Sequence, residues 1–179
     1  MSKKKEDLLK HAEDLFYKHG FHSIGLKRVV KEANVALMTL YNHFDSKEDL
    51  ILEVLKRREK KYFSYLEPSV TRPKNNSIAL SLAENHIHWI RLYETNGCMF
   101  LRAKEEFSSD SNQEIVRYVN EHKKSLIRFF EKLNFNYCES TRLALLFEGA
   151  TALSEILNVD DVARELIHSI KHLFENKLN

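Results

Sequence analysis

Glycine and proline are scarce in this chain, and their scarcity constrains the fold more than any other feature of the sequence. Only four Gly and two Pro occur among 179 residues. Sheet proteins need many tight turns, which rely on these two residue types, whereas helix interiors exclude both. With 43% hydrophobic residues, the chain also has enough apolar side chains for a buried core. The sequence therefore predicts an all-α globular protein.

The rest of the composition argues against several classes of protein. Cys98 and Cys138 form no CxxC pair, so we expect neither a disulfide framework nor a cysteine metal site. The N-terminus, MSKKKEDLLK, has no apolar run after its lysines and does not resemble a signal peptide. No apolar stretch approaches the roughly 20 residues of a membrane span. We expect a cytoplasmic protein with no membrane contact.

Apolar residues recur at helical spacing along most of the chain and predict about nine helices. The first, at 4–19, ends at Gly20, and the second, at 26–33, ends at Asn34, a residue type that tolerates a left-handed turn. A third, short helix must follow at once, because Val35, Leu40 and Phe44 require burial. Further helices are predicted at about 46–66, 77–95, 99–107, 111–133, 139–157 and 160–176.

The chain divides by pattern and by charge. Residues 67–76, EPSVTRPKNN, hold both prolines and no periodicity, which predicts a linker after a connecting helix at about 47–66. We therefore predict a three-helix N-terminal domain at 1–47 and a helical bundle domain at 48–179. Residues 1–66 carry 14 Lys and Arg against 10 Asp and Glu, and the remainder carries 14 against 16. The excess of basic residues in 1–66 indicates an anionic partner. The alternative is a chance asymmetry of charge on a solvated surface.

The segment VALMTLYNHF, residues 35–44, carries the strongest functional signal. Two short helices joined at Asn34 form a helix-turn-helix, whose second helix enters the major groove of DNA. At 100° per residue Leu40 faces inward, and Met38 and Asn42 face outward. A methionine can contact a thymine methyl group, and an asparagine can pair with adenine. The pattern predicts that these two residues read bases, and the alternative is a core helix of a larger bundle.

Other side chains near this helix are predicted to contact phosphates. Thr39, Tyr41, His43 and Lys47 offer hydroxyl, imidazole or ammonium donors, and the start of the preceding helix favours phosphate through its dipole. The predicted DNA-binding residues are Lys27, Arg28, Leu37, Met38, Thr39, Tyr41, Asn42, His43 and Lys47. The lysines at 3–5 are either a solvated tail or an arm that contacts DNA.

Residues 8–55 resemble the DNA-binding domain of the TetR/AcrR transcriptional regulators. The matching residues are Ala12, Leu15, Phe16, Gly20, Phe21, Ala33, Val35, Thr39, Leu40, Tyr41, His43, Phe44, Ser46, Lys47 and Leu50. The resemblance implies an all-helical homodimer, usually a repressor, that leaves a palindromic operator when a small molecule enters its C-terminal domain. It also implies that the two C-terminal helices, at about 139–157 and 160–176, form the dimer interface.

The chain departs from the family pattern at several positions. Ile24 and Gly25 stand where the family usually has threonine and a second small hydroxyl residue, which removes an expected phosphate contact. Leu37 and Met38 replace part of a Ser-Lys-Gly sequence, so we expect an operator preference particular to this protein. Residues 143–157 are apolar almost all round, and a second subunit could cover the side that the chain itself leaves open.

Aromatic and polar side chains on the middle helices are candidates for an effector pocket. Four of them place polar atoms on apolar stripes, and buried polar atoms need partners: Trp89, Tyr93, Tyr118 and His122. The predicted ligand-binding residues are His86, Trp89, Ile90, Tyr93, Phe100, Phe107, Tyr118, His122, Leu126, Phe147 and Thr151. The alternative is that they are ordinary core residues. The implied effector is a small, partly apolar molecule.

We expect no cofactor, no metal and no catalysis. His168 and His172 are four residues apart, but no further ligand accompanies them at metal spacing, so a solvated face is expected. The chain has no nucleophile elbow, no HExxH and no phosphate loop. Two alternatives to ligand control remain open. One is thiol oxidation at Cys98, which follows Gly97 near a helix start, and the other is a helical module that binds another protein.

Overall fold

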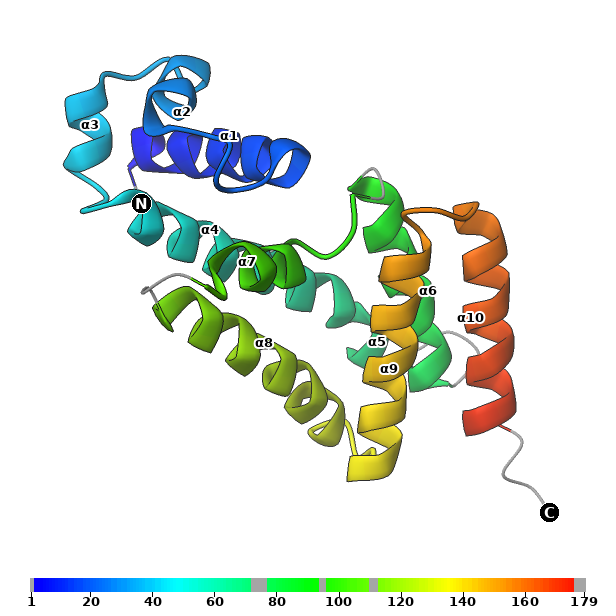
Figure 1. Ribbon diagram of the computed structural model, residues 1–179. Coiled ribbons are helices and arrows are strands. Elements are labelled where there is room, and N and C mark those ends of the chain that lie inside the picture. The colour runs from blue at the N-terminus through cyan, green and yellow to red at the C-terminus, as the bar shows by residue number, and fades with distance from the viewer. Residues whose placement is uncertain (1, 72–76, 94–95, 110–112, 176–179) are drawn as a thin grey trace. The chain divides into compact units, whose positions relative to one another are not determined.

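The computed structural model describes residues 2–71, 77–93, 96–109 and 113–175, and these residues form ten helices and no strand (Figure 1). The predicted all-α class is confirmed. The chain forms two compact units, Met1–Glu59 with Met99–Glu121 and Lys60–Cys98 with His122–Asn179. These units do not coincide with the predicted domains at 1–47 and 48–179, because residues 99–121 pack with the N-terminal helices. The functional division at residue 47 stays a prediction.

The N-terminal unit contains the predicted helix-turn-helix. Its helices are α1 (Lys3–His19), α2 (Leu26–Glu32), α3 (Leu37–Tyr41), α7 (Met99–Phe107) and the first parts of α4 (Lys47–Leu66) and α8 (Gln113–Glu131). Phe16, Phe21 and Phe44 are fully buried. Asn34 has φ 51°, so the predicted left-handed turn between α2 and α3 is present. It reverses the chain without a glycine.

A buried ion network joins α1 to α4 within this unit. The Glu13 carboxylate accepts hydrogen bonds from Arg57 at 2.7 Å and from Arg58 at 3.2 Å. The Arg58 guanidinium also lies over the Tyr17 ring, 4.3 Å from its centroid. Because Glu13 and Arg58 are both buried, each charge depends on the other for compensation. The network fixes the middle of the long helix α4 against the first helix.

The C-terminal unit is a helical bundle around a single apolar core. It contains the end of α4, α5 (Pro68–Thr71), α6 (Ile78–Leu92), the end of α8, α9 (Tyr137–Leu153) and α10 (Val159–Phe174). α6, α9 and α10 pack against one another (Figure 1). Leu66, Leu82, Phe130, Phe147 and Ile170 are buried in the core between them. Within the described ranges, no helix is both long and apolar enough to cross a membrane.

The structure shows a helical turn within the predicted linker and shifts some predicted helix ends. Residues 68–71 of the predicted linker form the helical turn α5, which begins with a proline at the position where helices tolerate it, and 72–76 lie outside the described residues. α3 is only five residues long, so Asn42 is its C-cap. α9 ends at Leu153, four residues before the predicted end, and the Ser154 hydroxyl donates to the Ala150 carbonyl there.

Candidate nucleic-acid interface and effector region

The outer face of α3 carries exposed side chains around a buried anchor. Leu40 is fully buried and anchors the helix, whereas Met38 is 69% exposed and Tyr41 is 47% exposed. Asn42 is exposed next to them, and its backbone N–H donates to the Met38 carbonyl at 3.0 Å. Leu37 is half-buried. A large apolar side chain that stays exposed beside an amide and a phenol has no packing role within this unit.

The predicted phosphate contacts differ in how open they are. Lys27 and Arg28 are exposed in the first turn of α2, and the Arg28 guanidinium lies 3.2 Å from His19 Nε2. His43 Nε2 lies 3.2 Å from the Ser2 hydroxyl. Thr39 is half-buried. The structure therefore leaves Lys27 and Arg28 exposed and His43 and Thr39 half-buried, and the DNA contacts of all four stay predictions.

Lys47 is half-buried, and its ammonium already has a partner within the protein. Its ammonium donates to the His22 carbonyl at 3.5 Å. Partial burial lowers its pKa, against the opposing influence of the Glu48 and Glu106 carboxylates. Lys47 would have to break its hydrogen bond to the His22 carbonyl in order to contact a phosphate. The sequence could not predict this, because the partner lies 25 residues earlier in the chain.

A carboxylate on α7 holds the loop between α1 and α2, and sequence reasoning missed it. Glu106 accepts hydrogen bonds from the backbone N–H of Phe21, at 2.9 and 3.0 Å, and of His22, at 2.7 Å. Gly20 has φ 84°, and a Cβ there would lie 2.8 Å from the same carboxylate. Only glycine therefore fits both the backbone and the space. Arg102, one turn earlier on α7, donates to the Tyr17 carbonyl at 2.6 Å.

Phe107 belongs to this α7 contact. Its ring packs on Phe21, with 6.0 Å between centroids, and on His22, with 4.7 Å between centroids. Phe107 was predicted as a ligand-binding residue from its place on an apolar stripe. Phe100 and Tyr118 also belong to the N-terminal unit, where Tyr118 donates to the Glu59 carboxylate. The structure does not bring these three into the unit that holds the other candidates.

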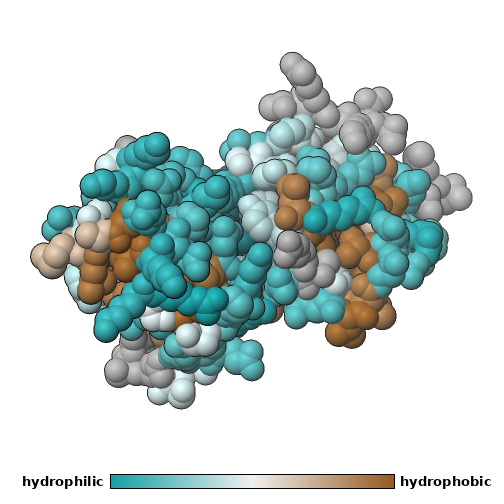
Figure 2. Space-filling view, turned by 90° about the horizontal axis from the view of Figure 1, so that it is seen from above, coloured by the Kyte–Doolittle hydropathy of each residue, from teal (hydrophilic) through white to brown (hydrophobic). Residues whose placement is uncertain are grey.

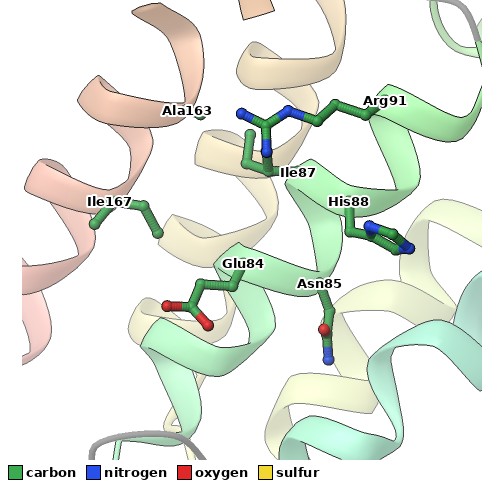
Figure 3. A pocket seen from close by; sticks show the side chains of 7 residues that line it. All are labelled: Glu84, Asn85, Ile87, His88, Arg91, Ala163 and Ile167. Atoms are coloured by element: carbon green, nitrogen blue, oxygen red, sulfur yellow. The ribbon is translucent and has the colours of Figure 1, made fainter. Parts of the chain in front are cut away.

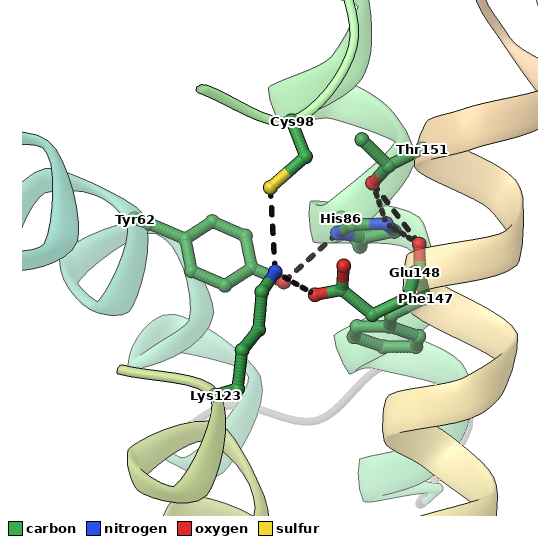
Figure 4. Close-up of polar contacts among 7 residues, drawn as sticks. All are labelled: Tyr62, His86, Cys98, Lys123, Phe147, Glu148 and Thr151. Atoms are coloured by element: carbon green, nitrogen blue, oxygen red, sulfur yellow. Dashed lines mark hydrogen bonds and ion pairs between the residues drawn. The ribbon is translucent and has the colours of Figure 1, made fainter. Parts of the chain in front are cut away.

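The other predicted ligand residues gather in the C-terminal unit around His86. The buried ones are His86, Trp89, Ile90, His122, Leu126 and Phe147, and the half-buried ones are Tyr93 and Thr151. His86 Nδ1 lies 2.9 Å from the Tyr62 hydroxyl, and Nε2 lies 2.9 Å from the Phe147 carbonyl (Figure 4). Since a carbonyl only accepts, Nε2 carries the proton and Nδ1 accepts from Tyr62. Burial is the main reason that the pKa of His86 falls to about 4, so the ring is neutral at neutral pH.

Lys123 stands beside this cluster, between a thiol and a carboxylate. Its ammonium is 3.3 Å from Cys98 Sγ and 2.6 Å from Glu148 Oε1 (Figure 4). Burial acts to lower the pKa of Lys123, but Cys98 and Glu148 together outweigh it, and the pKa is raised. Sequence reasoning identified Cys98 but neither Lys123 nor Glu148. On a helix such charged residues look like ordinary surface positions.

Among the described residues of the C-terminal unit, two cavities are lined by none of the predicted ligand residues. The larger, of about 520 Å³, lies between α6 and α10 (Figure 3). Its lining residues are Glu84, Asn85, Ile87, His88, Arg91, Ala163 and Ile167. The smaller, of about 270 Å³, lies along α9 and α10 and is mostly apolar. Leu145, Leu153, Leu157 and Leu166 contribute to it.

The smaller cavity belongs to an exposed apolar face. Leu145 is 68% exposed and Ile156 is 78% exposed, and Leu153 and Leu157 are about half exposed. The surface view shows hydrophobic residues gathered in patches on an otherwise hydrophilic face (Figure 2). Leu145, Leu153 and Leu157 line the same cavity, whereas scattered single leucines are common on protein surfaces.

Comparison with known proteins agrees with this arrangement. Residues 8–54 match the family of bacterial regulatory proteins of the tetR type. The HTH-type transcriptional regulator UidR of Escherichia coli K12 is 37% identical over 62 residues, which are 34% of this chain and only 32% of UidR. The chain therefore matches about a third of the length of that relative.

Solved structures resemble the chain over nearly its whole length. A TetR-family transcriptional regulator from Streptomyces coelicolor has a TM-score of 0.83 and 25% identity, covering 94% of this chain and 93% of that one. A TetR transcriptional regulator from Legionella pneumophila has a TM-score of 0.78 and 21% identity, covering 96% of this chain and 97% of that one. Both the N-terminal sequence and the complete fold thus point to the same class of protein.

Proposed function

We propose that this chain, which belongs to the TetR family of DNA-binding transcriptional regulators, is a dimeric repressor that a small molecule releases from its operator. The observation that carries the DNA-binding part is the outer face of α3. Met38, Tyr41 and Asn42 are exposed there, around the fully buried Leu40. We expect the protein to act in the cytoplasm and to catalyse no reaction.

We expect the two outward-facing residues of α3, Met38 and Asn42, to contact the bases. The thioether of Met38 suits the methyl group of thymine, and the Asn42 amide can donate to and accept from adenine in the major groove. Lys27 and Arg28 lie at the start of α2, where the helix dipole adds to their attraction for phosphate. These contacts would set the register of the protein on the duplex, and α3 would choose the sequence.

The exposed apolar face of α9 and α10 supports the dimer. The same surface on two copies would form a symmetric four-helix interface at about residues 139–157 and 160–176. Two α3 helices would then meet successive turns of the major groove, about 34 Å apart, on a palindromic site. Leu145 and Ile156 would be buried in this interface, and their high exposure in the single chain would be explained.

Release would follow from a shift between two conformations. An effector that binds better when the two α3 helices stand at the wrong separation weakens DNA binding by its own coupling free energy. α7 supports such a coupling, because Glu106 and Arg102 hold the backbone at the end of α1 and in the loop after it. A small, partly apolar molecule is the kind of effector that we propose.

Selection of duplexes from a random DNA library by the purified protein tests the proposal. We expect a palindromic winner whose affinity falls steeply with salt. The Asn42→Ala variant should lose about 1–3 kcal/mol of discrimination at one base pair of each half-site. Lys27→Ala should weaken binding to all sequences and reduce the salt slope by about one. Asn120→Ala, an exposed asparagine on α8, is the matched control and should change neither.

Two results would contradict the proposal. If Asn42→Ala weakened every duplex equally, Asn42 would have no part in reading bases. If the folded, dimeric protein enriched no DNA sequence and its DNA binding did not depend on salt, the exposed face of α3 would instead contact another protein.

A further inference from the structure

We propose that the larger cavity of the C-terminal unit, between α6 and α10, binds small ω-amino carboxylates. These molecules carry an ammonium group and a carboxylate at the two ends of a short aliphatic chain. The inference rests on the opposite charges of two residues that line the cavity and on the apolar side chains that line it with them. The control of DNA binding by such a ligand rests on the function proposed above, but the binding site itself does not.

Two residues of opposite charge line this cavity from the same face of α6. Glu84 and Arg91 are seven residues apart, which is close to two full helical turns, so they project in nearly the same direction. Figure 3 shows the Glu84 carboxylate and the Arg91 guanidinium on the side of α6 that faces α10. A carboxylate and a guanidinium form their strongest hydrogen bonds with groups of opposite charge. The two residues therefore suit a ligand with a cationic end and an anionic end.

Apolar side chains make up the rest of the wall on this side of the cavity. Ile87 on α6 is buried, and Ala163 and Ile167, one turn apart on α10, are half-buried. None of these side chains can form a hydrogen bond, so an aliphatic chain between the charged ends is favoured over a polar one. The cavity volume of about 520 Å³ lies within the range of known small-molecule sites.

The spacing of the two charged residues indicates the length of the ligand. Seven residues of α-helix rise by about 10.5 Å along the axis. With an advance of about 1.2 Å per bond and a hydrogen bond of about 2.9 Å at each end, four bonds between nitrogen and carboxylate carbon correspond to about 11 Å. We therefore expect 4-aminobutanoate and 5-aminopentanoate to fit. Glycine, whose two groups share one carbon, is too short.

The contacts that the charged residues already make leave capacity for a ligand. Arg91 donates from one guanidinium nitrogen to the Asp160 carboxylate. A guanidinium has five N–H donors, and a carboxylate accepts several hydrogen bonds through its two oxygens. The side chains of Arg91 and Asp160 are 51% and 74% exposed, so their ion pair contributes little to stability and opens readily.

The other two polar residues of the cavity are directed elsewhere. The Asn85 amide donates to the Ser69 hydroxyl at 2.7 Å, and the His88 ring lies against the Tyr65 ring, with 5.8 Å between centroids. Figure 3 shows both side chains on the side of α6 away from α10. We therefore assign recognition of the charged ends to Glu84 and Arg91 alone.

A ligand in this cavity would also act on the proposed dimer interface, because α10 lines both cavities. Ala163 and Ile167 line the larger cavity, and Val162 lines the smaller one on the exposed apolar face. The ligand carboxylate would compete for Arg91 with Asp160, which lies in the first turn of α10. We expect binding to shift α10 and thereby to weaken the grip on operator DNA.

Isothermal titration calorimetry of the full-length protein tests the site with three probes: 4-aminobutanoate, butanoate and butylamine. The wild-type protein should bind 4-aminobutanoate about tenfold or more tightly than either of the others, because each of them lacks one charged group. Glu84→Gln should weaken 4-aminobutanoate about tenfold without changing the affinity for butanoate. Arg91→Gln should weaken it by a similar factor without changing the affinity for butylamine.

Two further variants are matched controls. Arg164 forms an exposed ion pair with Asp161 in the first turn of α10, as Arg91 does with Asp160, but it does not line the cavity. Glu165 is exposed on α10 and lines the smaller cavity instead. Arg164→Gln and Glu165→Gln should therefore bind 4-aminobutanoate as the wild-type protein does.

Three results would overturn the site. The first is no binding of 4-aminobutanoate or 5-aminopentanoate to the folded wild-type protein at millimolar concentrations. The second is equal affinity for all three probes. The third is an equal loss in the cavity variants and the control variants, which would mean that overall charge attracts the ligand.

A second experiment addresses regulation. At the same concentration, 4-aminobutanoate should release the wild-type protein from its selected duplex and should leave Arg91→Gln bound. Binding in the calorimeter without release of DNA would overturn the regulatory role and leave the site in place. If the ligand-free protein bound no duplex, the proposed function would fail, and the calorimetry would still decide whether the site exists.

Discussion

At the scale of single residues, the Glu106 carboxylate holds a loop of the N-terminal unit. It accepts hydrogen bonds from two backbone N–H groups, those of Phe21 and His22, at 2.7 to 3.0 Å. Phe21 is fully buried, so its N–H has little access to water once the carboxylate is removed. Glu106→Ala should therefore lower the free energy of unfolding by about 2–3 kcal/mol. It should also weaken DNA binding, because the loop that it holds leads into α2.

Glu105 provides the matched control for this variant. It is the neighbouring residue on α7 and its side chain is exposed, so Glu105→Ala should change stability by less than about 0.5 kcal/mol. Urea unfolding and DNA titration of both variants would measure the two effects. Equal, small losses in both variants would mean that water replaces the Glu106 carboxylate without cost.

The same residues show what a sequence can and cannot reveal. Met38 and Asn42 could be identified because helix periodicity fixes the outward face of a short segment, and Leu40 is indeed buried opposite them. Glu106 could not be identified, because its partners lie 84 and 85 residues earlier in the chain. The packing of Phe107 on Phe21 and His22 could not be predicted either, because an apolar stripe has the same appearance whether it lines a cavity or packs on a neighbouring helix.

At the scale of helices, periodicity predicted the long elements and missed the one-turn helix α5. Both prolines fall within residues 67–76, yet one of them starts a helical turn. α9 illustrates a second limit. Its apolar residues point in all directions, so the sequence could predict that the helix is covered but not by what. In the structure one side packs in the core through Leu143 and Phe147, and another side presents Leu145 to solvent.

The exposed side of α9 carries a prediction about assembly. Leu145→Glu should raise the dissociation constant of the proposed dimer by about a hundredfold or more, because each subunit would bury a carboxylate at the interface. Size-exclusion chromatography with light scattering over a range of concentrations would measure it. Leu101→Glu, on the exposed side of α7, changes a leucine of comparable character and should leave the dimer intact. A monomeric wild-type protein, or a dimer in both variants, would place the interface elsewhere.

At the scale of the whole molecule, the resemblance to a family and the all-helical fold were both predictable, whereas the polar contacts of the interior were not. The residues that carry the resemblance sit in a local segment, 8–55, whose helices and turn depend on near neighbours. The polar contacts of the C-terminal unit bring together α4, α6, α8 and α9 through Tyr62, His86, Lys123 and Phe147. No local sequence pattern encodes contacts among four helices. The burial of His86 among them makes the stability of the protein depend on pH.

Burial of a neutral His86 makes stability depend on pH. The pKa of this residue is about 4 in the folded protein, against the ordinary histidine value of 6.5 that applies to the unfolded chain. Between these values the unfolded state binds more protons than the folded state, so stability decreases as the pH falls. The contribution is fully present above about pH 6.5 and is lost progressively down to about pH 4, for a total of roughly 3 kcal/mol.

His86→Gln tests this dependence, because glutamine does not titrate and its amide can still donate to the Phe147 carbonyl. The variant should be less stable near neutral pH, but its free energy of unfolding should fall less steeply between about pH 6.5 and pH 4. Urea unfolding across this range measures both slopes, and carboxylates that titrate near pH 4 affect both proteins alike. His88→Gln, an exposed residue on the same helix, should retain the wild-type slope. Parallel curves for wild type and His86→Gln would mean that His86 gains its proton without unfolding the helices around it.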